Sequence, residues 1–182
     1  MGRSAHILGM SASGAVPSGQ EDVVVSFDRP VWAEISLSAL RHNMRQIRSL
    51  LKPGVIFCPI IKADGYGHGA IPLAHEAAAL GAGYLGVAIL DEAAALRAGG
   101  ITLPILILGY TPPQAAPFVV SNHITQTIFS KEQADALSAA AGNLGMTVKV
   151  HVKVDTGMTR IGVRPEEAAA FCAYVAGLEN VH

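Results

Sequence analysis

The regular alternation of short apolar runs with helical segments is the feature that most constrains the fold of this chain. The apolar runs are continuous, as in parallel strands that are buried on both faces. A segment with helical signals follows each run, so five strand–helix units succeed one another. The expected strands are 55–61, 85–89, 105–108, 124–129 and 147–155. This alternation predicts an α/β fold built on a parallel sheet.

The expected helices have recognisable starts. Ser130 forms a capping box with Gln133, and Pro165 opens a helix whose first turn carries two glutamates. A short strand at 31–35 and an amphipathic helix capped by Ser36 precede the five units. The helices between and after the strands are expected at about 70–80, 91–97, 113–119, 131–141 and 165–176.

Two architectures fit five such units. An open doubly wound sheet would be complete at this length, whereas a TIM-type (β/α)8 barrel typically needs about 250 residues and would be incomplete. Residues 178–182 read as a helix-to-strand turn and the first step of a further strand, which favours the incomplete barrel. Residues 29–182 would then form a partial barrel domain. Residues 1–28, which lack the apolar core of a secretory signal, are expected to be a disordered tail.

The composition excludes several classes of function. With 51% hydrophobic and 15% charged residues, the chain is expected to have a packed core. A net charge of −1 without dense Lys/Arg runs argues against nucleic-acid binding. No apolar stretch approaches the roughly 20 residues of a membrane helix. Cys58 and Cys172 lie far apart without metal-ligand spacing, so we expect buried, reduced thiols in a cytoplasmic protein.

The first candidate site is the loop that begins at Lys62. The expected strand 55–61 runs into this lysine, and three glycines, Tyr66 and His68 follow within seven residues. In parallel α/β folds, sites lie at the carboxyl ends of the strands. A desolvated lysine amine there can form a Schiff base with a carbonyl compound. The glycines match neither a dinucleotide-binding nor a P-loop pattern, and no nucleophile elbow is present.

A second candidate site is the segment 150–162. His151, Lys153 and Asp155 alternate and would share one face of the expected strand. Such side chains are costly to bury unless they are paired, so this face is either functional or solvated. Arg160 follows in a loop between glycines, where its guanidinium can meet an anionic oxygen. The remaining histidines are expected on the surface, and no metal site is expected.

Taken together, residues 30–182 resemble the N-terminal half of alanine racemase, a pyridoxal-phosphate enzyme. The likeness is strongest at 61–69, which reads Ile-Lys-Ala-Asp-Gly-Tyr-Gly-His-Gly. It is also strong at 153–163, which reads Lys-Val-Asp-Thr-Gly-Met-Thr-Arg-Ile-Gly-Val. These two motifs, in this order and about 90 residues apart, are a specific combination. Further matching segments are 32–43, 90–97 and 104–109.

The resemblance implies roles for four residues. Lys62 would hold pyridoxal 5'-phosphate covalently and act as one of two catalytic bases. Tyr66 would contact the cofactor phosphate, and Arg160 would hydrogen-bond the phenolic oxygen of the cofactor. Lys153 matches a position that is often carbamylated in the family, and the new carboxylate would orient Arg160. Thr159 stands where many relatives carry glycine, a small change in this loop.

The resemblance also implies a reaction, the interconversion of L-alanine and D-alanine, which supplies D-alanine for cell-wall peptidoglycan. The family's second base is a tyrosine from a C-terminal β domain of the partner subunit, so a homodimer is expected for the full-length protein. We expect this chain to lack that domain and the last three barrel strands, and therefore not to racemise alanine alone. Two alternatives are an amino-acid racemase of broader specificity and a non-catalytic barrel that binds pyridoxal phosphate.

Overall fold

The computed structural model describes residues 33–182. The predicted tail at 1–28 and the start of the predicted strand at 31–35 lie outside the described residues. For the described part of that strand the prediction is wrong, because residues 33–36 have no regular secondary structure. An alternating pattern does not make a strand unless its backbone groups find partners. Within residues 33–182, no strand pairs with this segment.

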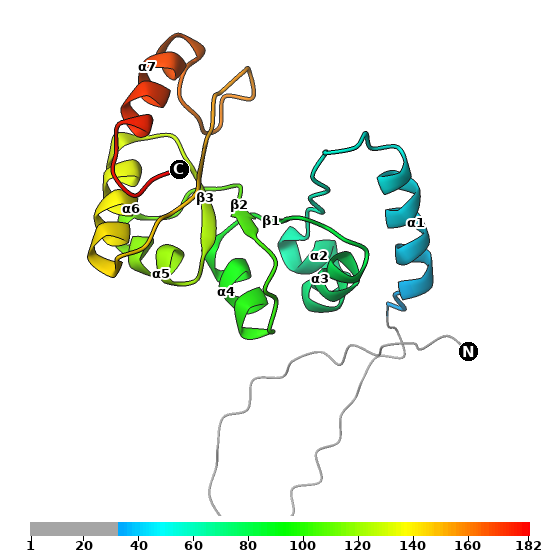
Figure 1. The fold of residues 1–182 in the computed structure, drawn as a ribbon. Coiled ribbons are helices and arrows are strands. Elements are labelled where there is room, and N and C mark those ends of the chain that lie inside the picture. Colours follow the sequence, from blue (N-terminus) through cyan, green and yellow to red (C-terminus); the bar gives the residue numbers. More distant parts are fainter. Residues whose placement is uncertain (1–32) are drawn as a thin grey trace, which may run out of the picture.

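A parallel sheet forms the centre of the fold (Figure 1). A bridge between Ile60 and Gly86 extends the sheet before its first strand, and one between Val148 and Val181 extends it beyond its last strand. Each strand pairs with the next one in the sequence, and all pairs are parallel. In order across the sheet, the strands are β1 (Leu85–Val87), β2 (Ile105–Ile107), β3 (Ile124–Ile128) and β4 (Val150–Val152).

The strand order decides between the two predicted architectures. In a doubly wound sheet the order reverses at a switch point, whereas in a barrel the strands follow one another around the axis. Here the pairing runs in sequence order from Ile60 to Val181, with Leu85, Ile105 and Ile124 aligned across β1 to β3. The sheet is open in Figure 1. The prediction of an incomplete (β/α)8 barrel is therefore confirmed, including the beginning of a further strand at Val181.

The first expected strand, 55–61, pairs as a strand only at its end. Ile61 N–H donates to Gly86 O (2.8 Å), and Gly86 N–H donates to Pro59 O (2.9 Å). The paired part stays short because Pro59 has no N–H with which to continue the ladder. A Cβ at Gly86 would lie 2.4 Å from Ile60 Cδ1, so a larger residue there would have to displace the Ile60 side chain.

The helices lie close to their predicted positions. Ser36 accepts a hydrogen bond from Ala39 N–H (3.2 Å) and Ser130 accepts one from Gln133 N–H (3.3 Å), so both predicted caps are confirmed. No helix within residues 33–182 is long and apolar enough to cross a bilayer. The bounds are α1 (Leu37–Ser49), α3 (Ala70–Ala79), α4 (Leu90–Ala98), η1 (Pro113–Ala115), α5 (Ala116–Ser121), α6 (Lys131–Leu144) and α7 (Pro165–Ala176).

The core lies between the sheet and the helices, where side chains such as Ile105 are fully buried. The two cysteines lie at its margin. Both are free, but Cys58 is only half-buried and Cys172 is exposed, so the expectation of two buried thiols is wrong. In α7 the buried side chains are Phe171 and Val175, one turn apart, which leaves the adjacent Cys172 facing solvent.

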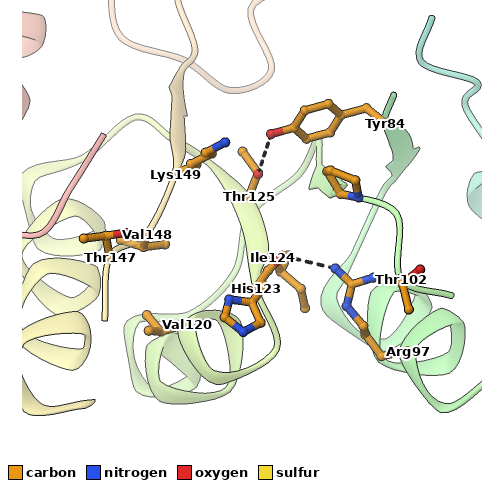
Figure 2. Close-up of a pocket in the computed structure, with 11 residues that line it drawn as sticks. Tyr84, Arg97, Thr102, Val120, His123, Ile124, Thr125, Thr147, Val148 and Lys149 are labelled. Atoms are coloured by element: carbon orange, nitrogen blue, oxygen red, sulfur yellow. Dashed lines mark hydrogen bonds between the residues drawn. The ribbon is translucent and has the colours of Figure 1, made fainter. Parts of the chain in front are cut away.

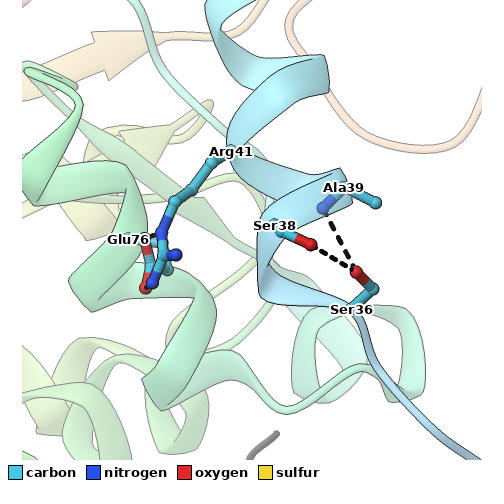
Figure 3. A network of polar contacts seen from close by, with 5 residues as sticks. All are labelled: Ser36, Ser38, Ala39, Arg41 and Glu76. Carbon is cyan, nitrogen blue, oxygen red and sulfur yellow. Dashed lines mark hydrogen bonds and ion pairs between the residues drawn. The ribbon is translucent and has the colours of Figure 1, made fainter. Parts of the chain in front are cut away.

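An ion pair ties α1 to α3 (Figure 3). Arg41 donates to both carboxylate oxygens of Glu76, from Nε at 2.5 Å and from Nη2 at 2.6 Å. The hydrogen bond from Arg41 is the main reason why the pKa of Glu76 lies below its ordinary value of 4.5. The pair joins the first described helix to the helix that follows the Lys62 loop.

This lowered pKa predicts a pH-dependent contribution to stability. The contribution of Glu76 is present above pH 4.5 and is lost as the pH falls through the lowered folded-state pKa. The difference in free energy of unfolding between the unchanged chain and Glu76→Gln should therefore shrink on acidification, as measured by urea denaturation. The exposed Glu179, changed to Gln, is the matched control. A Glu76→Gln difference that stays constant from neutral pH to about pH 3 would contradict the assignment.

Candidate functional site

The Lys62 loop forms a left-handed turn at the carboxyl end of the first barrel strand. The turn is α2 (Lys62–Gly67), in which four consecutive residues have φ values of 51°, 51°, 63° and 55°. Only one of these four, Gly65, is a glycine. Left-handed backbone costs other residues about 1–2 kcal/mol each. Contacts from elsewhere in the fold must therefore hold this turn in place.

Several hydrogen bonds hold the turn. Gly69 N–H donates to Asp64 O (2.9 Å), and Ala70 N–H at the start of α3 donates to Asp64 Oδ1 (2.7 Å). Gly65 packs so closely that a Cβ there would lie 2.9 Å from Leu73 Cδ2. The absence of a side chain at Gly65 thus lets the turn pack closely against α3.

Lys62 and Tyr66 lie together at the open end of the turn. The Lys62 Nζ is 5.9 Å from the centroid of the Tyr66 ring, within the range of a cation–π contact. Lys62 is half-buried, whereas Tyr66 is 59% exposed. The nearby His68 has its Nδ1 3.0 Å from both Gly65 O and Tyr66 O, so this ring braces the turn. The primary amine of Lys62 therefore lies close to the ring of Tyr66.

The second predicted site follows β4. Lys153 Nζ donates to Leu108 O (2.9 Å), which follows β2, so this lysine reaches across the carboxyl end of the sheet. Asp155 is turned into its own loop, where Oδ1 accepts hydrogen bonds from Thr159 N–H (2.9 Å) and Gly157 N–H (3.0 Å). These hydrogen bonds lower the pKa of Asp155 below its ordinary value of 3.8, and the bond from Thr159 has the largest effect. The strand's polar face is therefore partly paired and partly solvated.

The predicted site residues form two groups. Lys62 and Tyr66 lie beside the first strand, and Lys153 and Arg160 lie beside and beyond β4. The unmodified Lys153 donates to Leu108 O and not toward Arg160, which is exposed. Figure 1 shows α2 beside β1, whereas the loop that precedes α7 lies nearer to β3. The orienting role expected of Lys153 stays a prediction.

Sequence reasoning missed Glu92, which it placed only within the expected helix 91–97. Its Oε1 accepts a hydrogen bond from Ala63 N–H (2.6 Å), the residue directly after Lys62. A signal was present in the sequence, because the expected strands 55–61 and 85–89 are consecutive. Lys62 follows the first of them and Glu92 follows the second. The carboxyl ends of neighbouring parallel strands lie at the same edge of the sheet.

A separate pocket of about 280 Å³ lies at the other end of the sheet (Figure 2). Its lining includes Tyr84, His123 and Lys149, which come directly before or at the start of strands. Arg97 contributes to the wall of the pocket. Its guanidinium donates hydrogen bonds to four backbone carbonyl groups and so links the loops before β2 and β3. The amino ends of barrel strands serve stability, so this pocket is not the candidate active site.

Comparisons of the sequence with known proteins identify the family of this chain. The sequence profile described as the N-terminal domain of alanine racemase matches residues 35–182. An alanine racemase from Desulfovibrio desulfuricans is 91% identical over 159 residues, which is 87% of this chain and 43% of that protein. This chain belongs to the alanine racemase family.

Solved structures of the alanine racemase family have the same fold. An alanine racemase from Clostridium difficile 630 has a TM-score of 0.77 and 44% identity, over 80% of this chain and 38% of that one. A histidine racemase from Leuconostoc mesenteroides has a TM-score of 0.71 and 32% identity, over 80% and 39%. This chain thus spans about two fifths of the length of the family members that it matches.

The lowered pKa of Asp155 makes the loop that carries Arg160 sensitive to acid. The amide protons of Gly157 and Thr159 should titrate together in an NMR pH series, with a midpoint below 3.8. Their bonds to the carboxylate persist above this range and weaken as the pH falls through the lowered pKa. In Asp155→Asn the amide shifts should show no such step. A shared midpoint above 3.8 would contradict the account.

Proposed function

We propose that this chain is the lysine-bearing part of a pyridoxal-phosphate enzyme that interconverts L-alanine and D-alanine. The observation that carries the proposal is the 91% identity to an alanine racemase over 159 residues, which is 87% of this chain. The position of Lys62 at the carboxyl end of a barrel strand supports it, because enzymes with this fold keep their reactive groups there.

The residues at this end of the sheet suit the chemistry of pyridoxal phosphate. The cofactor presents an aldehyde, a phosphate and a phenolic oxygen. Lys62 offers a primary amine for covalent attachment, and the exposed Tyr66 hydroxyl offers a donor for the phosphate. Arg160 offers a guanidinium for the phenolic oxygen. Lys153, when carbamylated, would carry a carboxylate that attracts Arg160 instead of repelling it.

The reaction requires two proton-transfer groups. When bound, pyridoxal phosphate delocalises the negative charge left at Cα after a proton is removed. Once the amino group of the substrate has displaced it from the cofactor, Lys62 Nζ would serve as the base on one face of the substrate, taking the proton or returning it. Inversion needs a second base on the opposite face. The family resemblance assigns that base to a tyrosine of a partner subunit, so we propose a cytoplasmic homodimer for the longer protein.

The choice of alanine rests on sequence identity and not on the barrel alone. The structural neighbour from Leuconostoc mesenteroides is a histidine racemase, so this fold accommodates enzymes for different amino acids. The relative at 91% identity is an alanine racemase, and this degree of identity favours the same substrate. A broader amino-acid range is therefore the second candidate function.

A chimera tests the proposal. Residues 35–182 of this chain would replace the matching segment of the Desulfovibrio desulfuricans relative. We expect the chimera to interconvert L-alanine and D-alanine, as followed by coupled detection of D-alanine. Lys62→Ala should abolish the activity, whereas the exposed Lys52→Ala should preserve it, because only Lys62 lies at the strand end.

Two results would oppose the proposal. Equal racemisation by Lys62→Ala and the unchanged chimera would remove the lysine from the mechanism. Turnover of other amino acids at rates matching that of alanine would favour the racemase of broader specificity.

A further inference from the structure

Glu92 connects the lysine turn to the next strand of the barrel. Its Oε1 accepts a hydrogen bond from Ala63 N–H at 2.6 Å. Its Oε2 accepts from Ala88 N–H at 2.7 Å and from Ile89 N–H at 3.3 Å, at the end of the segment that contains β1. One half-buried carboxylate thus receives hydrogen bonds from two neighbouring barrel segments.

Helix capping explains only half of this arrangement. A glutamate in the first turn commonly accepts a hydrogen bond from the backbone N–H that precedes its helix, and the bonds from Ala88 and Ile89 are of this kind. The bond from Ala63 is different, since it links residues 29 positions apart and leaves the helix altogether. A glutamate that served only as a cap would have no need of it.

The bond to Ala63 acts at the peptide that follows Lys62. Ala63 is the first of the four left-handed residues, a conformation that alanine rarely adopts. Rotation of the Lys62–Ala63 peptide toward ordinary backbone would break the hydrogen bond to Glu92. It would also change the backbone from which the Lys62 side chain projects. The carboxylate therefore holds the lysine's direction as well as the turn.

We propose that Glu92 is a positioning residue that aims Lys62 for covalent attachment of the cofactor. This inference rests on the function proposed above. It assigns Glu92 no contact with substrate or cofactor. The residue acts through the peptide N–H of Ala63, and its effect on the reaction passes through the orientation of Lys62.

Two variants separate positioning from capping. Glu92→Gln keeps the size of the side chain but replaces one acceptor oxygen with an NH2 group, which cannot accept from a backbone N–H. Glu92→Asp keeps the charge and can still cap its own helix, but it is one methylene too short to span to Ala63 as well. Asp91→Asn, an exposed carboxylate in the same helical turn, is the matched control.

The experiment titrates pyridoxal phosphate into the 182-residue chain and its variants. The absorbance of the lysine-linked cofactor reports attachment, and the NMR signal of the Ala63 amide reports the contact. We expect Glu92→Asp to bind the cofactor about tenfold more weakly, as when the binding orientation of Lys62 is populated about one tenth of the time. The Ala63 amide should lose its hydrogen-bonded shift in Glu92→Asp. Glu92→Gln keeps one acceptor oxygen, so its cofactor binding should fall only if its Ala63 amide shift is lost as well. Glu92→Asp should stay fully folded under the conditions of the titration, and Asp91→Asn should match the unchanged chain throughout.

The outcomes distinguish this inference from the proposed function. If the unchanged chain forms no lysine-linked cofactor, the proposed function fails and the inference falls with it. If the unchanged chain forms it and Glu92→Asp forms it equally well, the inference alone is overturned. If Glu92→Gln does not fold, Glu92→Asp decides the matter by the same comparison.

Discussion

The parallel contact between Ile60 and Gly86 is the constraint on which the candidate site depends. It attaches the first barrel segment to β1 through two backbone hydrogen bonds, and the missing side chain of Gly86 makes room for Ile60. Lys62 comes two residues after this contact, so the pairing fixes where the lysine leaves the sheet. The Arg41–Glu76 pair and the hydrogen bond from Ala63 to Glu92 then hold the flanking helices and the turn.

Much of the fold could be predicted from local sequence signals. Short runs rich in apolar and β-branched residues indicated β1 to β4, and capping residues such as Ser130 indicated where helices begin. These signals are local, because they arise from hydrogen bonds and packing within a few residues. The strand predicted at 31–35 failed for the opposite reason. Strand pairing depends on a distant partner, and the described part of this segment has none within residues 33–182.

The geometry of the site could be predicted from the sequence less well than the fold. The glycines near Lys62 indicated an unusual loop, but the left-handed turn extends over Ala63, Asp64 and Tyr66 as well. Glycine content does not reveal this, because the distant carboxylate of Glu92 helps to hold these residues. Burial was also misjudged for Cys172, since the apolar face of α7 passes through Phe171 and Val175 instead.

The two motifs occupy separate places on the sheet for a topological reason. Lys62 follows the first barrel segment and Lys153 follows β4, the fifth in sequence order. In a closed barrel of eight strands, the first and fifth strands stand on opposite sides of the axis. The two motifs would then face each other across the mouth of such a barrel, although they make no direct contact in residues 33–182.

Peptide mapping is the most direct test of whether Lys62 carries the cofactor. The chain would be incubated with pyridoxal phosphate, reduced with borohydride and digested, and the modified lysine would be located by mass spectrometry. The account predicts that the reduced cofactor is found predominantly on Lys62. Equal modification of Lys62 and exposed lysines such as Lys52 and Lys131 would contradict it.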